Sequence, residues 1–155
     1  MTIRRAGAHD AGDVTLLLRQ VHKVHADGRP DIFKPGGIKY TDEELKELLC
    51  DPERPVFVYE EEGKVLGYVF CIFEYQKETS SVREIKTLYI DDLCVDEAAR
   101  GRGIGKALYE RACEEAKETG CYRVTLHVWE LNPGAGAFYE KLGMKTLMRT
   151  MEHIL

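Results

Sequence analysis

Hydrophobic positions along the chain change their spacing several times, and each change marks a new predicted element. Thr2–Arg5 alternates, which predicts a short strand. From Asp10 to about Asp27 the apolar residues recur at spacings of three and four, which predicts an amphipathic helix packed on a sheet. These residues are Val14, Leu17, Leu18, Val21 and Val24. Gly28 and Pro30 end the helix.

A loop and a second helix follow. Gly28–Gly37 is rich in turn-forming residues, so it predicts an irregular loop. Thr41–Glu44 matches the capping box S/T-x-x-E. The helix that it starts has a buried side formed by Leu45, Leu48 and Leu49 and ends before Pro52.

The middle of the chain predicts three consecutive strands. Val56–Tyr59 and Val65–Tyr75 are joined by a charged turn that carries Gly63 where a positive φ is needed. Val82–Val95 is the third strand. Because the connections are short, we expect an antiparallel meander.

The order of elements then alternates. We expect a helix over Gly103–Thr119, a strand over Tyr122–Val128, a helix over Pro133–Leu142 and a final strand over Met144–Glu152. A meander that continues into a strand–helix–strand unit predicts an α/β fold of the α+β type. Its mixed, mostly antiparallel central sheet has six to seven strands, flanked by about four helices.

Composition narrows the possible classes of protein. A chain of 155 residues, 44% hydrophobic and 32% charged, fits one globular domain over residues 1–155. The net charge of −5 argues against general nucleic-acid binding. We find no apolar run of signal-peptide or membrane-span length, so we expect a cytoplasmic protein without a membrane partner. Five cysteines without a C-x-x-C pair predict reduced, mostly buried thiols and no metal site.

A basic, glycine-rich turn connects the third strand of the meander to the next helix. It consists of Arg100, Gly101, Arg102, Gly103, Ile104, Gly105 and Lys106. Glycines let backbone N–H groups approach a ligand, and the helix that starts here adds unpaired donors and a positive dipole end. Three cations in the same turn favour a ligand with several phosphate charges.

Two common phosphate motifs do not fit this turn. A Walker loop would need Gly at position 100 and Ser or Thr at 107, where the chain has Arg100 and Ala107. The pattern G-x-G-x-x-G fails from both Gly101 and Gly103. The remaining pattern, Arg-x-x-Gly-x-Gly at a strand-to-helix turn, resembles the acyl-CoA pyrophosphate loop of the GNAT superfamily of N-acetyltransferases. A glycine-rich turn without a phosphate role is the alternative.

A second motif strengthens the resemblance. Asn132–Met144 matches the superfamily pattern N-x-x-A-x-x-F-Y-x-x-x-G-[FM] without a gap. Asn132 followed by Pro133 is also a helix N-cap, and Tyr139 lies at a spacing typical of a core aromatic residue. The two motifs and the order of elements together resemble the GNAT fold over nearly the whole chain.

This resemblance implies an acetyl-CoA-dependent N-acetyltransferase in which an amine attacks the thioester directly. The turn at 100–106 would hold the pyrophosphate, with Asn132 and Ala135 on the CoA arm and Tyr139 as the acid that protonates the departing thiolate. The strand matching Ile90–Val95 splays away from its neighbour in relatives, so the backbone of Leu93, Cys94 and Val95 would bind pantetheine. Cys94 as an acyl-accepting nucleophile is an alternative to a buried structural thiol.

Three residues compete for the role of general base. Asp91 and Asp92 lie on an apolar strand, where carboxylates are costly unless they face a cleft or a partner. Strand alternation predicts that they point to opposite faces. Asp91 is four residues before Val95, where polyamine acetyltransferases carry a glutamate. His127 lies five residues before Asn132, where ribosomal-protein N-terminal acetyltransferases carry a glutamate. Imidazole suits proton removal, although a buried structural histidine is equally plausible.

The amine acceptor stays open. The resemblance implies that the acceptor pocket is lined by the loop Gly28–Gly37, the second helix and Lys145–His153, as in relatives. The acidic balance and the paired aspartates favour a cationic small amine or a peptide amine.

His22 and His25 lie three apart and could share a face, but no third metal ligand is near them in sequence. A homodimer is a family expectation. A non-catalytic acyl-CoA-binding module and transfer of a longer acyl group are the rival interpretations.

Overall fold

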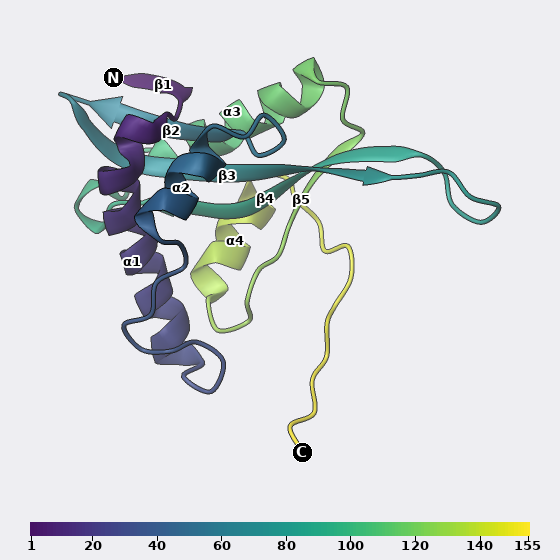
Figure 1. The fold of residues 1–155 in the computed structure, drawn as a ribbon. Helices are drawn as coiled ribbons and strands as arrows, with labels where there is room; N and C mark the ends of the chain where they lie inside the picture. Colours follow the sequence, from purple (N-terminus) through teal and green to yellow (C-terminus); the bar gives the residue numbers. More distant parts are fainter.

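Five strands form one sheet in the computed structural model, which describes residues 1–155 (Figure 1). The strands, in the spatial order β1-β2-β3-β4-β5, are β1 (Thr2–Arg5), β2 (Val56–Glu61), β3 (Lys64–Gln76), β4 (Ile85–Val95) and β5 (Arg123–Leu126). Neighbours are antiparallel from β1 to β4, and β4 pairs with β5 in parallel. The predicted mixed, mostly antiparallel sheet is confirmed.

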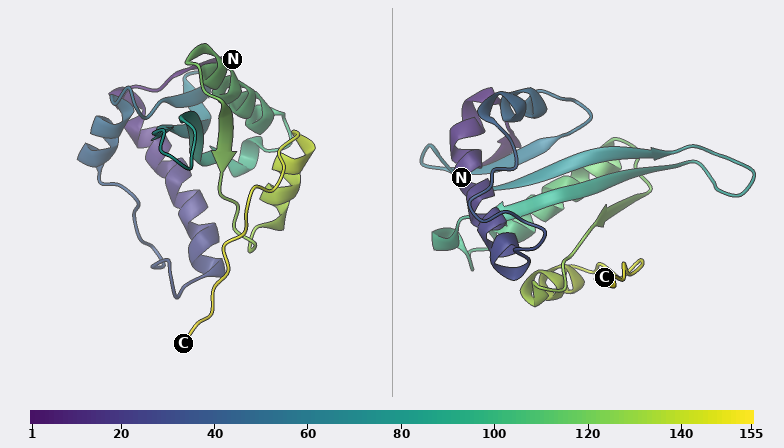
Figure 2. Two further views of the ribbon diagram at one scale, coloured as in Figure 1. Left: turned by 90° about the vertical axis from the view of Figure 1, so that its right-hand side faces the viewer. Right: turned by 60° about the horizontal axis from the view of Figure 1, so that its bottom comes forward.

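Four α-helices cover the two faces of this sheet. They are α1 (Ala11–Gly28), α2 (Asp42–Leu49), α3 (Ile104–Glu118) and α4 (Pro133–Lys141), with short 3₁₀ turns at Ala8–Asp10 and Glu97–Ala99. Figure 2 shows α1 and α2 on one side of the sheet and α3 and α4 on the other. None of these helices is long and apolar enough to cross a membrane.

Each face has its own apolar core. Leu17, Leu45 and Phe70 belong to the cluster under α1 and α2. Leu88, Ile104 and Leu108 belong to the cluster under α3. Since both faces of the central strands are buried, those strands are almost continuously apolar rather than alternating.

The start of α2 follows the capping chemistry that the sequence predicts. The hydroxyl of Thr41 accepts a hydrogen bond from the amide of Glu44 (3.2 Å), and the Glu44 carboxylate accepts one from the amide of Thr41 (3.1 Å). This reciprocal box confirms the predicted start of α2.

The predicted final strand over Met144–Glu152 is wrong, and the sheet has five strands instead of six to seven. Residues 145–155 are exposed and irregular, and they make no backbone–backbone hydrogen bond. The segment contains several apolar residues, but a strand also needs a neighbouring strand to pair with. This segment instead runs away from the sheet beside β5 (Figure 1).

Candidate functional site

The parallel strands β4 and β5 pair over only four residues. Their ladder runs from Thr87 opposite Arg123 to Ile90 opposite Leu126. There β5 ends, whereas β4 continues to Val95. The side of β4 that faces away from β3 is therefore unpaired from residue 91 onward, where the predicted pantetheine-binding residues Leu93, Cys94 and Val95 lie.

The turn after β4 exposes a row of backbone donors. Gly101 and Gly103 have φ of 78° and 81°, a conformation that favours glycine. The amides of residues 100–106 donate to no backbone or side-chain acceptor in the structure. No side chain caps α3 and no acidic residue lies in its first turn, so these N–H groups and the positive end of the helix dipole face outward together.

The three predicted cations of this turn differ in their surroundings. Arg102 is held by Glu61 through contacts of 2.7 and 2.9 Å. Lys106 lies 3.7 Å from Glu110. Arg100 forms no ion pair with an acidic side chain and donates weakly to the carbonyl of Val95 (3.4 Å). Arg100 is thus the cation of the turn without an acidic partner.

Helix α4 lies next to this turn. A Cβ atom on Gly105 would come within 3.3 Å of the Phe138 ring, so the absence of a side chain at 105 lets α3 and α4 approach. Asn132 caps α4, because its side-chain oxygen accepts from the amide of Ala135 at 3.2 Å. The capping role predicted for Asn132 is confirmed, and Ala135 lies in the same first turn.

Tyr139 lies on α4 in an aromatic group. Its ring centroid is 5.0 Å from that of Phe138 and 6.3 Å from that of Tyr109. Burial raises the pKa of Tyr139 above its ordinary value, and the charge of Asp92 adds to the rise. The phenol therefore stays protonated at neutral pH, and its hydroxyl makes no hydrogen bond within the protein.

A β-bulge places both aspartates of β4 on one face. Cys71 is opposite Ile90 and Phe70 is opposite Asp92, so Asp91 has no partner residue on β3. The prediction that Asp91 and Asp92 point to opposite faces is wrong, because the extra residue interrupts the alternation. Both now lie on the side of α1 and α2.

The two carboxylates have different surroundings. Asp91 accepts from the Lys39 ammonium group at 2.9 Å and is a quarter exposed. Asp92 is partly buried and accepts from the Tyr68 hydroxyl at 2.7 Å. Burial raises the pKa of Asp92 above its ordinary value, although the Tyr68 hydrogen bond and Lys39 oppose the rise.

His127 and Cys94 are also where the sequence places them, at the end of β5 and on β4. His127 is exposed, so the interpretation as a buried structural histidine is wrong; its Nδ1 lies 3.2 Å from the Tyr89 hydroxyl. Burial raises the pKa of the Cys94 thiol to about 12, and the thiol donates to the carbonyl of Leu17. A thiol that resists ionisation is a poor nucleophile, which favours the structural interpretation of Cys94.

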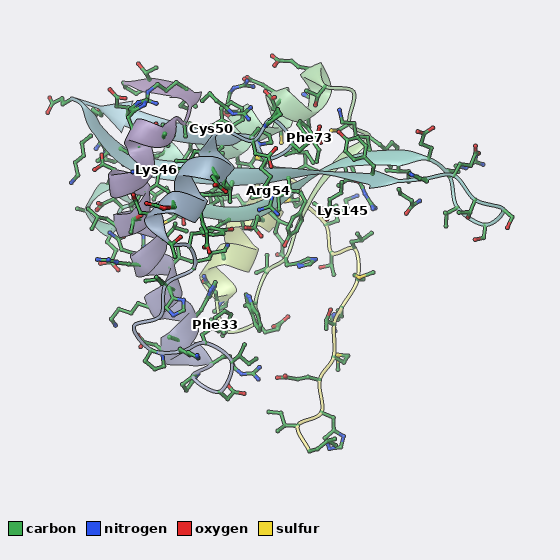
Figure 3. The ribbon with its side chains drawn as sticks, in the orientation of Figure 1. Phe33, Lys46, Cys50, Arg54, Phe73 and Lys145 are labelled. Atoms are coloured by element: carbon green, nitrogen blue, oxygen red, sulfur yellow. The ribbon has the colours of Figure 1, made fainter.

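An aromatic group that the sequence analysis missed links α1 to the connection between β5 and α4. The His25 ring lies 4.9 Å from Phe33, and Phe33 lies 5.4 Å from Trp129 of the β5–α4 connection. Phe33, labelled in Figure 3, thereby joins the loop after α1 to that connection. Burial lowers the pKa of His25, which leaves its ring neutral near pH 7. The only signal in the sequence was the pair Ile32 and Phe33 in the otherwise polar loop Gly28–Gly37.

The variant Asp92→Asn is expected to melt at a higher temperature than the wild type at neutral pH. The pKa of Asp92 is higher in the folded protein than in the unfolded chain, so its protonated form stabilises the fold in acid. This stability is fully present below the ordinary carboxyl pKa and is lost as pH rises through the raised pKa. Asparagine avoids this loss and still accepts from Tyr68. Thermal unfolding across pH should show a difference that is largest at neutral pH and vanishes in acid.

Asp91→Asn is the matched control for this prediction. It removes the partner of Lys39, a partly buried cation, and should lower the melting temperature. An Asp92→Asn protein that melts below the wild type at pH 7 would contradict the assignment of Asp92 as a destabilising carboxylate.

The chain resembles known proteins along most of its length. The model of the Acetyltransferase (GNAT) family matches residues 19–144. An uncharacterized N-acetyltransferase of Methanocaldococcus jannaschii, MJ1207, is 38% identical over 101 residues, which are 65% of this chain and 43% of that protein. The chain thus spans less than half the length of this relative. Thialysine N-epsilon-acetyltransferase of Bos taurus is 28% identical over 156 residues, covering 94% of this chain and 84% of that enzyme.

A solved structure shares the whole fold. The crystal structure of a point mutant of the BH1408 protein from Bacillus halodurans superposes with a TM-score of 0.96 at 33% identity, covering 100% of this chain and 99% of that one.

Proposed function

The chain belongs to the GNAT family of acetyltransferases, and from this membership we propose that it transfers an acetyl group from acetyl-CoA to a primary amine. The amine attacks the thioester directly, without an acyl-enzyme intermediate. Residues 1–155 act as one N-acetyltransferase domain. The observation that carries the proposal is the row of backbone N–H groups at residues 100–106 that have no hydrogen-bond acceptor within the protein. This row follows directly after the unpaired part of β4.

We assign the turn at 100–106 to the pyrophosphate of the cosubstrate. A diphosphate accepts several N–H donors at once, and both positive-φ glycines leave open space where a side chain would stand. Arg100 supplies the positive charge that no neighbouring carboxylate neutralises. Leu93, Cys94 and Val95 offer backbone groups to the pantetheine arm, with Asn132 and Ala135 at the facing end of α4.

Tyr139 is the proposed general acid. Acyl transfer from a thioester expels a thiolate, and a protonated phenol whose hydroxyl has no partner can donate to it. The raised pKa of Tyr139 keeps that proton in place until the thiolate forms.

Asp92 is the proposed general base. A carboxylate with a raised pKa is a better proton acceptor near neutral pH than an ordinary one, and the charge of Asp92 contributes to the raised pKa of Tyr139. Asp91 is already bonded to Lys39, and His127 is exposed beside Tyr89. These contacts favour Asp92 over the other two candidates.

The acceptor that fits best is a cationic amine. Lys39 pairs with Asp91 and the His25 ring is neutral, so the Asp92 carboxylate is the charge on the face below α1 and α2 that is left to attract a cation. Similarity to a thialysine N-epsilon-acetyltransferase over 94% of the chain supports the same class of acceptor.

A thiol-release assay tests the proposal. Acetyl-CoA is supplied with polyamines, lysine analogues, amino acids, aminoglycosides and peptides, and release of CoA is followed with a thiol reagent. We expect amine-dependent release that is fastest with a cationic small amine. Tight acetyl-CoA binding without release for any amine would contradict the enzyme and indicate a non-catalytic module.

A further inference from the structure

A lysine fastens the connection between α1 and α2 to the bulge in β4. This connection, residues 29–40, runs back from the end of α1 toward the start of α2 (Figure 1). Near its end, the Lys39 ammonium group donates to the Asp91 carboxylate at 2.9 Å, although the two residues are 52 positions apart. The Lys39 side chain is 39% exposed and that of Asp91 is 25% exposed. Water and salt therefore screen this ion pair only in part.

The bulge leaves Lys39 next to two carboxylates instead of one. Asp91 and Asp92 are consecutive and share one face of β4, because the extra residue interrupts the alternation. Neighbouring carboxylates oppose each other's ionisation, whereas a nearby cation favours it. Burial raises the pKa of Asp92, the charge of Asp91 adds to the rise, and the charge of Lys39 opposes it. The lysine thus offsets at Asp92 the effect of Asp91.

The other titratable groups around Asp92 carry no charge near pH 7. They come from several elements and are Tyr68 of β3, His25 of α1, Tyr40 of the connection, Tyr89 and Cys94 of β4, and Tyr139 of α4. Burial lowers the pKa of the histidine and raises the pKa of the four tyrosines and the thiol, so all six groups are neutral. Lys39 and Asp91 are the charged groups that remain.

We propose that Lys39 is a positioning residue for acetyl transfer, which neutralises Asp91 and thereby lets Asp92 carry the negative charge that a general base needs. This role rests on the proposed function, since Lys39 acts through Asp92 and not on the reacting atoms. Without the ammonium group, two adjacent carboxylates would share one partly buried face, and Asp92 would hold its proton to a higher pH. A purely structural ion pair would fasten the connection without setting the charge of Asp92.

Carboxyl ¹³C resonances measure this role without turnover. The resonance of Asp92 is identified by its absence from Asp92→Asn, and its pH titration is followed in the protein alone. Lys39→Met keeps an unbranched side chain of similar length and removes the charge, so the midpoint of the Asp92 titration is expected to move up by about half a pH unit or more. Lys39→Arg restores the cation and should bring the midpoint back toward that of the wild type.

Two further variants separate charge from structural damage. Lys34→Met is the matched control, because Lys34 is an exposed lysine of the same connection whose ammonium group pairs with no carboxylate. It should leave the Asp92 midpoint in place. Asp91→Asn should move the midpoint down, since Lys39 then acts on Asp92 without a competing carboxylate. Damage to the connection would instead move the midpoint in the same direction in Lys39→Met and Asp91→Asn.

The pH dependence of kcat at saturating amine is the second readout. Its acid limb, where Asp92 takes up a proton, should move up in Lys39→Met and stay in place in Lys34→Met. The role of Lys39 would be overturned by an Asp92 midpoint that does not move in Lys39→Met, or by one that moves equally in Lys34→Met. Failure of the proposed function would look different, because the wild type would then release no CoA with any amine at any pH.

Discussion

Replacing Tyr139 with phenylalanine is expected to lower kcat by about 100-fold or more, the usual contribution of a general acid. The change removes one hydroxyl and leaves the ring contacts with Phe138 and Tyr109 in place. Because the hydroxyl has no hydrogen bond within the protein, its loss leaves no buried group unpaired. KM for acetyl-CoA should change little. Steady-state thiol release with the best amine of the panel measures both constants.

Tyr109→Phe is the matched control. Tyr109 lies in the same aromatic group, and burial raises the pKa of this phenol too, to about 12. Its removal should leave kcat within about twofold. Equal losses from the two variants, or unchanged turnover of Tyr139→Phe across pH, would show that Tyr139 is a packing residue and not the acid.

Replacing Gly103 with valine is expected to weaken acetyl-CoA binding by more than about tenfold. At φ 81° a β-branched residue is strained by roughly 1–2 kcal/mol or more, so the turn shifts and its amides no longer converge on one diphosphate. The new side chain would also stand in the open space in front of those amides. Calorimetric titration with acetyl-CoA gives the affinity.

Gly120→Val separates strain from binding. Gly120 has a similar φ of 74° at the opposite end of α3, with nothing near its Cβ position. Both variants should lose comparable thermal stability, whereas only Gly103→Val should lose affinity for acetyl-CoA. If the two bound the cosubstrate equally well, the turn would have no role in phosphate recognition.

Much of the fold is readable from the sequence because its signals are local. The capping box at Thr41, the cap at Asn132 and the apolar spacing along α1 act over a few residues. The structure confirms both caps and the helix, although Val24 of the predicted apolar stripe is 41% exposed. Each of the two family motifs is an uninterrupted stretch of sequence, so the turn at 100–106 and α4 could be placed from the sequence alone. Their proximity through Gly105 and Phe138 needed the tertiary structure.

The features that sequence reasoning missed depend on distant partners. The bulge at Asp91 follows from the register of β4 against β3, and no pattern within β4 signals it. The pairing of Arg102 with Glu61 joins residues 41 positions apart, so the three cations of the turn looked equivalent in sequence. The strand expected at 144–152 depends on an edge to pair with, which a propensity cannot supply.

Backbone amide resonances of the turn give the most direct test of the account. In a ¹⁵N-labelled protein titrated with CoA, the amides of Gly101, Gly103 and Gly105 are expected to shift strongly and saturate together with the calorimetric binding curve, while that of Gly120 stays in place. Saturable binding that leaves the three glycine amides unmoved would place the diphosphate elsewhere and contradict the assignment of the turn.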